Sequence, residues 1–160
     1  MSIVLLRVDE RLIHGQVVIG WGHELRPDRY VVVDDTLAES EWEQGLYRLG
    51  AGGTDVVFLT ASEAAAALAE YGDDASRTVI LTRDVATMRR LAEGAALKGR
   101  TVNVGGLHHG PGRKKVLTYI HLTPSEAEDV RRLVDEGVRV QARDLPDAPK
   151  VDLAAELGFK

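Results

Sequence analysis

The 160-residue sequence contains no cysteine. This absence excludes disulfide bonds and thiolate metal sites, and it disfavours a secreted scaffold, which normally depends on disulfides. No apolar run approaches the roughly 20 residues that a membrane-spanning helix requires. The N-terminus also lacks the basic segment and the small-residue cleavage site of a signal peptide. Together these absences favour a cytosolic protein.

Basic residues are outnumbered by acidic ones. The chain has 20 Lys and Arg residues against 25 Asp and Glu residues, which gives a formal net charge of −5. Because nucleic-acid-binding proteins normally present a basic face, we expect no nucleic-acid partner. Hydrophobic residues make up 44% of the chain, and at this length such a composition is typical of one globular domain, here residues 1–160.

Several common catalytic and cofactor-binding motifs are missing as well. No serine lies in a G-x-S-x-G turn and no cysteine nucleophile exists, which disfavours the corresponding hydrolases. Neither a G-x-G-x-x-G turn after the first predicted strand nor a G-x-x-x-x-G-K-[ST] phosphate loop occurs. The neighbours His108 and His109 are conceivable metal ligands, but adjacent histidines rarely converge on one ion, so a polar loop is the preferred interpretation. We expect no cofactor and no metal.

Hydrophobic runs of strand length alternate with amphipathic stretches of helix length. The predicted strands are residues 2–8, 30–33, 55–59, 78–81, 101–104, 116–120 and 138–142. The predicted helices are residues 16–25, about 37–49, a segment capped by Thr60 or Ser62 that reaches 71, 84–93, 124–136 and a short one within 151–157. This alternation predicts an α/β fold, a single-domain, doubly wound, mainly parallel sheet of six to seven strands with helices on both faces.

Two predicted elements have special features. Residues 116–120 have no helix before them, so we expect this strand to be antiparallel or to lie at an edge of the sheet. The second predicted helix carries Ala38, Trp42, Leu46 and Leu49 on one side, at helical spacing. Exposed apolar positions leave a homodimer as an open alternative.

Residues 7–17 concentrate charged and reactive side chains between the first predicted strand and the first predicted helix. Arg7, Asp9, Arg11 and His14 all lie in this segment. At such a place in an open α/β sheet, ligands meet the carboxyl ends of strands and the unpaired N–H groups of a helix N-terminus. Because Arg7 belongs to a run that is otherwise buried, we expect its guanidinium to emerge at the end of the strand. The segment therefore indicates a site for an anion.

A histidine in this setting is suited to carry a phosphoryl group. Its free pKa of about 6.5 leaves a nucleophilic neutral ring near neutral pH. The charge of a transferring phosphoryl group must be offset by cations and N–H groups. Gly15 leaves the imidazole of His14 uncrowded, and Asp9 is placed to orient Arg11 or the imidazole N–H. The alternative for any single histidine is a polar surface residue with weak ion pairs.

The pattern Arg7-x-Asp9-x-Arg11-Leu-Ile-His14-Gly-Gln-Val17, followed by Trp21, resembles the start of a known protein family. It is similar to IIB components of the mannose/fructose/sorbose family of the bacterial phosphoenolpyruvate-dependent sugar phosphotransferase system. The similarity continues through residues 32–35, 81–82, 102–106, 122–123, 137–138 and 143–146, so it covers essentially the whole chain in order. Where the family often has a proline after the second helix, this chain has Gly50-Ala-Gly-Gly53.

The resemblance implies a phosphocarrier subunit with a fold of the kind predicted above. His14 would accept a phosphoryl group from a phosphohistidine of the IIA partner and pass it to sugar entering through the membrane subunits IIC and IID. The chain would then be a protein-phosphohistidine–sugar phosphotransferase, cytoplasmic and held at the inner face of the membrane by IIC and IID. In the family the phosphate is carried on Nδ1. The strand begins at once, so we expect no IIA domain before it.

The resemblance also gives roles to the other residues of the first loop. Arg11 and Arg7 are the candidates to stabilise charge, and Asp9 is the orienting residue. Gly15 and Gln16 would supply amides of the helix N-terminus.

Three further sites come from topology and charge. Thr60 and Gly105 are candidate neighbours of the phosphate, because both are predicted at the carboxyl edge of the sheet. The basic cluster of residues 113–115 either meets an acidic partner surface or is simply solvated.

One alternative function stays open. A non-catalytic or regulatory domain of the same family could bind an anion or a phosphosugar at this loop without forming a covalent bond. A carrier forms an acid-labile, base-stable phosphohistidine, whereas a binding domain shows only reversible affinity. The sugar itself cannot be identified from this chain, because the membrane subunits largely select it.

Overall fold

The computed structural model describes residues 2–159. Its main sheet has seven strands in the order β3-β2-β4-β1-β5-β8-β9, and every neighbouring pair is parallel except β8 and β9. These strands are β1 (Ile3–Asp9), β2 (Arg29–Val33), β3 (Asp55–Leu59), β4 (Thr78–Thr82), β5 (Thr101–Gly106), β8 (Arg139–Ala142) and β9 (Val151–Asp152). The predicted α/β fold with a mainly parallel sheet is confirmed.

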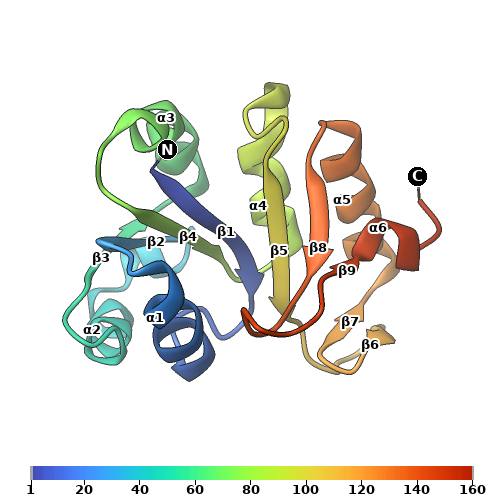
Figure 1. The fold of residues 1–160 in the computed structure, drawn as a ribbon, viewed down its shortest axis with the longest axis horizontal. Coiled ribbons are helices and arrows are strands. Elements are labelled where there is room, and N and C mark those ends of the chain that lie inside the picture. The colour runs from blue at the N-terminus through green and yellow to red at the C-terminus, as the bar shows by residue number, and fades with distance from the viewer. Residues whose placement is uncertain (1, 160) are drawn as a thin grey trace.

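The helices follow the strands closely in sequence. They are the π-helical η1 (Gln16–Trp21), α1 (Gly22–Leu25), the 3-10 turn η2 (Leu37–Glu39), α2 (Glu41–Gly50), α3 (Ala61–Asp73), α4 (Val85–Ala92), the 3-10 turn η3 (Glu93–Ala95), α5 (Pro124–Asp135) and α6 (Leu153–Glu156). Figure 1 shows α1 and α2 near the β2–β3 end of the sheet, and α5 and α6 near the β8–β9 end. No helix within residues 2–159 is both long and apolar enough to span a membrane.

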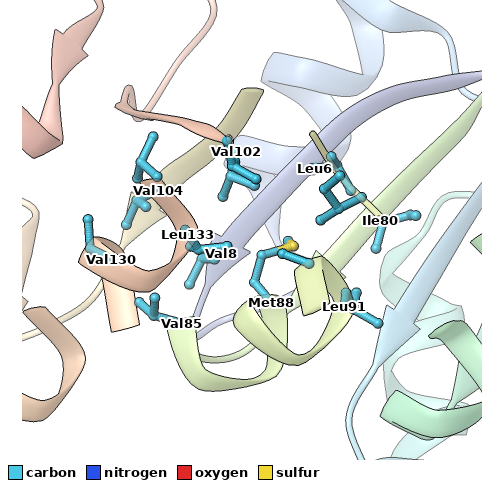
Figure 2. Packing of buried hydrophobic residues seen from close by; sticks show 14 of the residues in the cluster. Leu6, Val8, Ile80, Val85, Met88, Leu91, Val102, Val104, Val130 and Leu133 are labelled. Carbon is cyan, nitrogen blue, oxygen red and sulfur yellow. The ribbon is translucent and has the colours of Figure 1, made fainter. Parts of the chain in front are cut away.

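The sheet separates two hydrophobic cores, because alternate residues of each strand face opposite sides. On one side, α3, α4, α5 and α6 pack against the strands, and Met88 of α4 lies against them close to Leu6 of β1 (Figure 2). On the other side, Val17 of η1 packs in a second cluster with Val32 of β2. Helices therefore cover both faces, as predicted from the βα alternation.

Two predicted elements near the C-terminal half differ from the structure. Residues 116–120 do not form one strand: β6 (Lys114–Leu117) and β7 (Ile120–Leu122) form a separate antiparallel hairpin around Thr118 and Tyr119. The predicted short helix within 151–157 begins with two residues that pair with β8 as β9, and only then becomes α6. The side chain of Asp152 accepts the Ala155 N–H, which caps this helix after the strand pair.

The second predicted helix is interrupted and is turned away from the core. A break at Ser40 separates η2 from α2. Trp42, Leu46 and Leu49, which share one side of α2, are exposed by 76%, 52% and 83%. The buried residue of this helix is the polar Gln44, whose Nε2 donates to the carbonyl of Leu37 at 2.7 Å.

The order of the strands places a topological switch point beside β1. This strand lies between β4 and β5. From its end the chain turns toward β2, whereas from the end of β5 it turns the opposite way, toward β8. Ligands of open α/β sheets bind at such a switch point, at the carboxyl ends of the strands. Arg7 is paired with Asn103 and Asp9 with Gly106, so the loop after β1 lies directly against the end of β5.

Candidate functional site

Arg7 is completely buried, so the expectation that its guanidinium emerges at the end of β1 is wrong. Its Nη1 donates to Asn103 Oδ1 at 2.6 Å and to the carbonyl oxygen of Arg143 at 3.0 Å. Its Nη2 donates to Asp9 Oδ2 at 3.0 Å and to the carbonyl oxygen of Asp144 at 3.1 Å. Burial lowers the pKa of Arg7, while the charge of Asp9 opposes that change. Arg7 therefore positions Asp9 and is closed off from any ligand.

Gly105 leaves space for the buried guanidinium of Arg7, and Trp21 packs against it. A Cβ atom at Gly105 would overlap the guanidinium of Arg7, so the close approach of β5 requires glycine there. The Cζ of Arg7 lies 5.4 Å from the ring centroid of Trp21, within the range of a cation–π contact. The indole Nε1 of Trp21 donates to the carbonyl oxygen of Asp144 at 2.8 Å. Gly105 is thus brought to the site, where it contacts Arg7.

Asp9 is the centre of the hydrogen bonds in the first loop. It is fully buried, and besides Arg7 its Oδ2 is bonded to Nε2 of His14 at 2.9 Å. Its Oδ1 accepts the backbone N–H of Arg11 at 3.1 Å and the Nε–H of Arg11 at 3.3 Å. Burial alone would raise the pKa of Asp9, but the hydrogen bond to His14, the charge of Arg7 and the N–H of Arg11 together lower this pKa well below its usual range. Asp9 is therefore a carboxylate at neutral pH.

The contact with Asp9 fixes the state of the His14 ring. An ionised carboxylate only accepts hydrogen bonds, so Nε2 of His14 carries the hydrogen. In the neutral ring the lone pair is then on Nδ1. The side chain of His14 is 16% exposed, and open space surrounds the Cα of Gly15 next to it. The histidine is thus held by one nitrogen, and in the neutral ring the other nitrogen carries the lone pair.

Arg11 and the start of η1 complete the first loop. The Arg11 side chain is 36% exposed, and its Nη2 donates to Oε1 of Gln16 at 2.8 Å. The carbonyl of His14 accepts the N–H groups of both Val17 and Val18, at 3.0 and 2.9 Å. The residues from Gln16 to Trp21 form the π-helical η1, and π-helical turns are rare and often lie at functional positions. Within residues 2–159 no backbone acceptor takes the N–H of Gly15 or Gln16, so both are free to donate to an anion.

Thr60 is not part of this loop, contrary to the sequence-based expectation. It follows β3, the outer strand of the sheet, which is separated from β1 by β2 and β4. Three strand spacings amount to roughly 14 Å. Its hydroxyl caps α3 in a capping box, accepting the N–H of Glu63 at 3.1 Å. The expectation failed because the carboxyl edge of a seven-stranded sheet is wider than one binding site.

Glu10 and Arg113 form a second network beside the site, which the sequence did not predict. Nη1 of Arg113 donates to Oε1 of Glu10 at 3.3 Å, and its Nε and Nη2 bind both carboxylate oxygens of Glu126 at 3.0 and 2.8 Å. The same Glu10 oxygen accepts the backbone N–H of His108. Arg113 thus links the first loop to the N-terminus of α5. The only feature of the sequence that could have indicated this network was the position of Glu10 next to Asp9.

The loop after β5 directs its two histidines to different neighbours. Nδ1 of His108 lies 3.2 Å from Glu10, whereas the ring of His109 packs edge-on against His121 at 5.8 Å between centroids. Of the basic cluster at residues 113–115, Arg113 is committed to its two carboxylates, while Lys114 and Lys115 are exposed. Whether the two lysines meet an acidic partner stays a prediction.

Comparison with known proteins identifies the family. The protein-family model described as the phosphotransferase-system sorbose subfamily IIB component matches residues 3–160 of this chain. The sorbose-specific EIIB component of Klebsiella pneumoniae is 30% identical over 157 residues, covering 96% of this chain and 93% of that protein. The N-acetylgalactosamine-specific phosphotransferase enzyme IIB component 1 of Escherichia coli is 29% identical over 151 residues, covering 93% and 94%.

A solved structure gives the same result at the level of the fold. The crystal structure of the IIBSor domain of the sorbose permease from Klebsiella pneumoniae matches with a TM-score of 0.86 at 27% identity, and the match covers 99% of this chain and 97% of that chain. The buried ion pair, the oriented histidine and the switch-point loop thus occur in a fold shared along almost the entire length. The chain belongs to the sorbose subfamily of IIB components of the sugar phosphotransferase system.

Proposed function

We propose that this chain is the phosphocarrier between a phosphorylated IIA partner and the membrane subunits IIC and IID, with His14 as the residue that carries the phosphoryl group. The observation that supports this most directly is the 2.9 Å contact between Asp9 and Nε2 of His14. It holds the hydrogen on Nε2 and leaves Nδ1 as the attacking atom. Family membership supports the same role. The protein would work in the cytoplasm, at the inner face of the membrane.

In the accepting step, the lone pair of Nδ1 attacks the phosphorus carried by the IIA histidine. The new N–P bond forms on His14 while the N–P bond of the partner breaks, so the phosphoryl group changes nitrogen without loss to water. The ring of His14 gains positive charge during the attack, and the carboxylate of Asp9 offsets it through the Nε2–H. The half-exposed guanidinium of Arg11 and the free N–H groups at the start of η1 offset the charge on the phosphoryl oxygens.

In the delivering step, a hydroxyl oxygen of the sugar attacks the same phosphorus. The O–P bond forms, the N–P bond breaks, the hydroxyl proton leaves to water, and His14 returns to the neutral ring held by Asp9. Both partners must reach one nitrogen in turn, so we expect transient contacts of modest area with each. The curated relatives are named for different sugars, and we assign none to this chain.

The test is a phosphorylation assay read by intact mass. The chain is incubated with phosphoenolpyruvate, the general phosphotransferases and a IIA protein. We expect one added phosphoryl group that is lost in acid, kept in base and absent from His14→Ala, while circular dichroism shows that the variant is folded. An unchanged adduct on His14→Ala would rule out His14 as the carrier. Reversible anion binding without any adduct, from a IIA protein shown to be phosphorylated, would favour the non-catalytic alternative.

A second variant tests the role of Asp9. In Asp9→Asn the amide group can donate a hydrogen bond to Nε2, which would move the ring hydrogen to Nδ1 and block the nucleophile. We expect the rate of phosphoryl acceptance to fall by about 10²-fold or more. The matched control is Asp129→Asn on α5, which removes a carboxylate paired with Arg89 at 2.9 Å, away from the loop. Equal rates for the wild type and Asp9→Asn would contradict the orienting role.

A further inference from the structure

The large hydrophobic side chains that are exposed in the described part of the chain gather on η1 and α2. They are Ile19 at 74%, Trp42 at 76%, Leu46 at 52% and Leu49 at 83% exposure. Apolar side chains left in water lose the free energy that burial would provide. Val18 and Ile19 line the same hollow as Ala51 and Gly52, which follow α2, so η1 lies beside the C-terminal end of α2. A soluble protein rarely exposes such a patch without a partner for it.

The apolar side of helix α2 faces away from the core, and a polar residue faces the core. Trp42, Leu46 and Leu49 recur at intervals of four and three residues and therefore share one side. The opposite side holds Gln44, which is buried and bonded to the carbonyl of Leu37. An amphipathic helix in a closed core would show the reverse arrangement. The apolar side of α2 is thus placed to be covered by something outside the described chain.

The charged side chains beside this apolar stripe are complementary to the same side chains of a second, antiparallel copy. Glu41 at the start of α2 and Arg48 near its end are exposed, lie on the same flank of the stripe and have no ion-pair partner within residues 2–159. The guanidinium of Arg48 lies over the ring of Phe58, 5.0 Å from its centroid. In a two-fold pair of antiparallel helices, the same flank of each copy comes together with its ends reversed. Glu41 of each copy then faces Arg48 of the other, and Trp42 faces Leu49. Gly45 beside Leu46 allows the helices to approach closely.

We propose that two copies of this chain associate through the α2 face, with the helices antiparallel. This inference is independent of the proposed phosphocarrier role. A second copy fits better than an unlike partner. In the antiparallel arrangement, the same surface of the second copy covers the apolar stripe and places an opposite charge against each flanking charge. Figure 1 shows α2 at one end of the molecule, so pairing there leaves the β8–β9 end free.

The test is the mass of the full chain in solution, measured by sedimentation over a concentration series. We expect a shift toward twice the monomer mass, and Leu46→Glu at the centre of the face should abolish it. Glu41→Arg alone should raise the dimer dissociation constant by about tenfold or more, because it sets like charges against each other. The double variant Glu41→Arg/Arg48→Glu should recover the dimer. Glu128→Arg on α5, where Glu128 is 52% exposed, is the control with the same charge change as Glu41→Arg.

Three outcomes would overturn the proposal. The first is a wild-type chain that stays monomeric at every concentration. The second is a dimer that survives Leu46→Glu with the fold intact by circular dichroism, because the contact would then lie elsewhere. The third is a double charge variant that stays monomeric although each single variant is folded. If the wild type is monomeric and Leu46→Glu slows phosphorylation by IIA, the face belongs to that partner instead.

Discussion

A guanidinium with no contact to solvent is rare, and Arg7 is kept in the fold by the acceptors around it. Two side-chain and two backbone oxygens take its Nη hydrogens, while its Nε has no partner within residues 2–159. Replacing one partner of such a buried pair typically costs about 3–5 kcal/mol, because the other charge is left without compensation. The proposed nucleophile His14 thus depends, through Asp9, on a residue that is closed off from any ligand.

The space that Gly105 leaves for this guanidinium gives a sharp prediction. Gly105→Ala should reduce the free energy of unfolding by about 3 kcal/mol or more, because the new Cβ collides with the guanidinium of Arg7. Gly106→Ala is the neighbouring control: its Cβ would come 3.0 Å from Nη2 of Arg11 and 3.2 Å from Oδ1 of Asp9, contacts that shifts of a few tenths of an ångström relieve, so we expect a smaller loss. Urea unfolding measures both. Equal losses for the two variants would show that the close approach at Gly105 is not the cause.

The lowered pKa of Asp9 predicts a specific loss of stability in acid. The unfolded chain, with an Asp pKa of about 3.9, takes up this proton before the folded chain does. The stabilisation from Asp9 is therefore complete above about pH 5 and is lost progressively as the pH falls below about 4. Asp9→Asn should be less stable at pH 7, and its free energy of unfolding should change less between pH 5 and pH 3. Parallel profiles for wild type and variant in urea unfolding would contradict this.

The side chain of Arg113 connects the loop between β5 and β6 to the first loop and to α5. Arg113→Ala leaves Glu10 and Glu126 without their shared cation, at an expected cost of about 1–3 kcal/mol. We expect faster amide hydrogen exchange at residues 107–113, with Lys114→Ala as the exposed control. Unchanged exchange in Arg113→Ala would mean that the backbone bonds between Leu107 and β7 suffice.

Helix α2 shows what periodicity can and cannot predict for an element. The spacing of Trp42, Leu46 and Leu49 correctly indicates a helix with one apolar side. It contains no information on whether that side meets the sheet or another molecule, because both give the same pattern. The caps at Thr60 and Thr123 were predictable, since each depends only on a glutamate three residues later.

At the scale of the whole molecule, the strands and the fold class followed from local patterns, because buried parallel strands are apolar throughout and alternate with helices. The immediate surroundings of His14 followed from residues within one loop. The burial of Arg7 did not, because its acceptors lie at Asn103, 96 residues away, and at Arg143, 136 residues away. Long-range partners of this kind have no local signal. The assignment of residues 1–160 to a single domain stays a prediction.

The hydrogen bonds of Arg7 to residues distant in the sequence also have a consequence for biosynthesis. The backbone oxygens of Arg143 and Asp144 that accept hydrogen bonds from Arg7 belong to a segment that is synthesised after every strand except β9. A nascent chain that lacks this segment lacks two of the four oxygens that bind Arg7. We therefore expect Arg7, Asp9 and the ring of His14 to reach their final arrangement only when synthesis is almost complete.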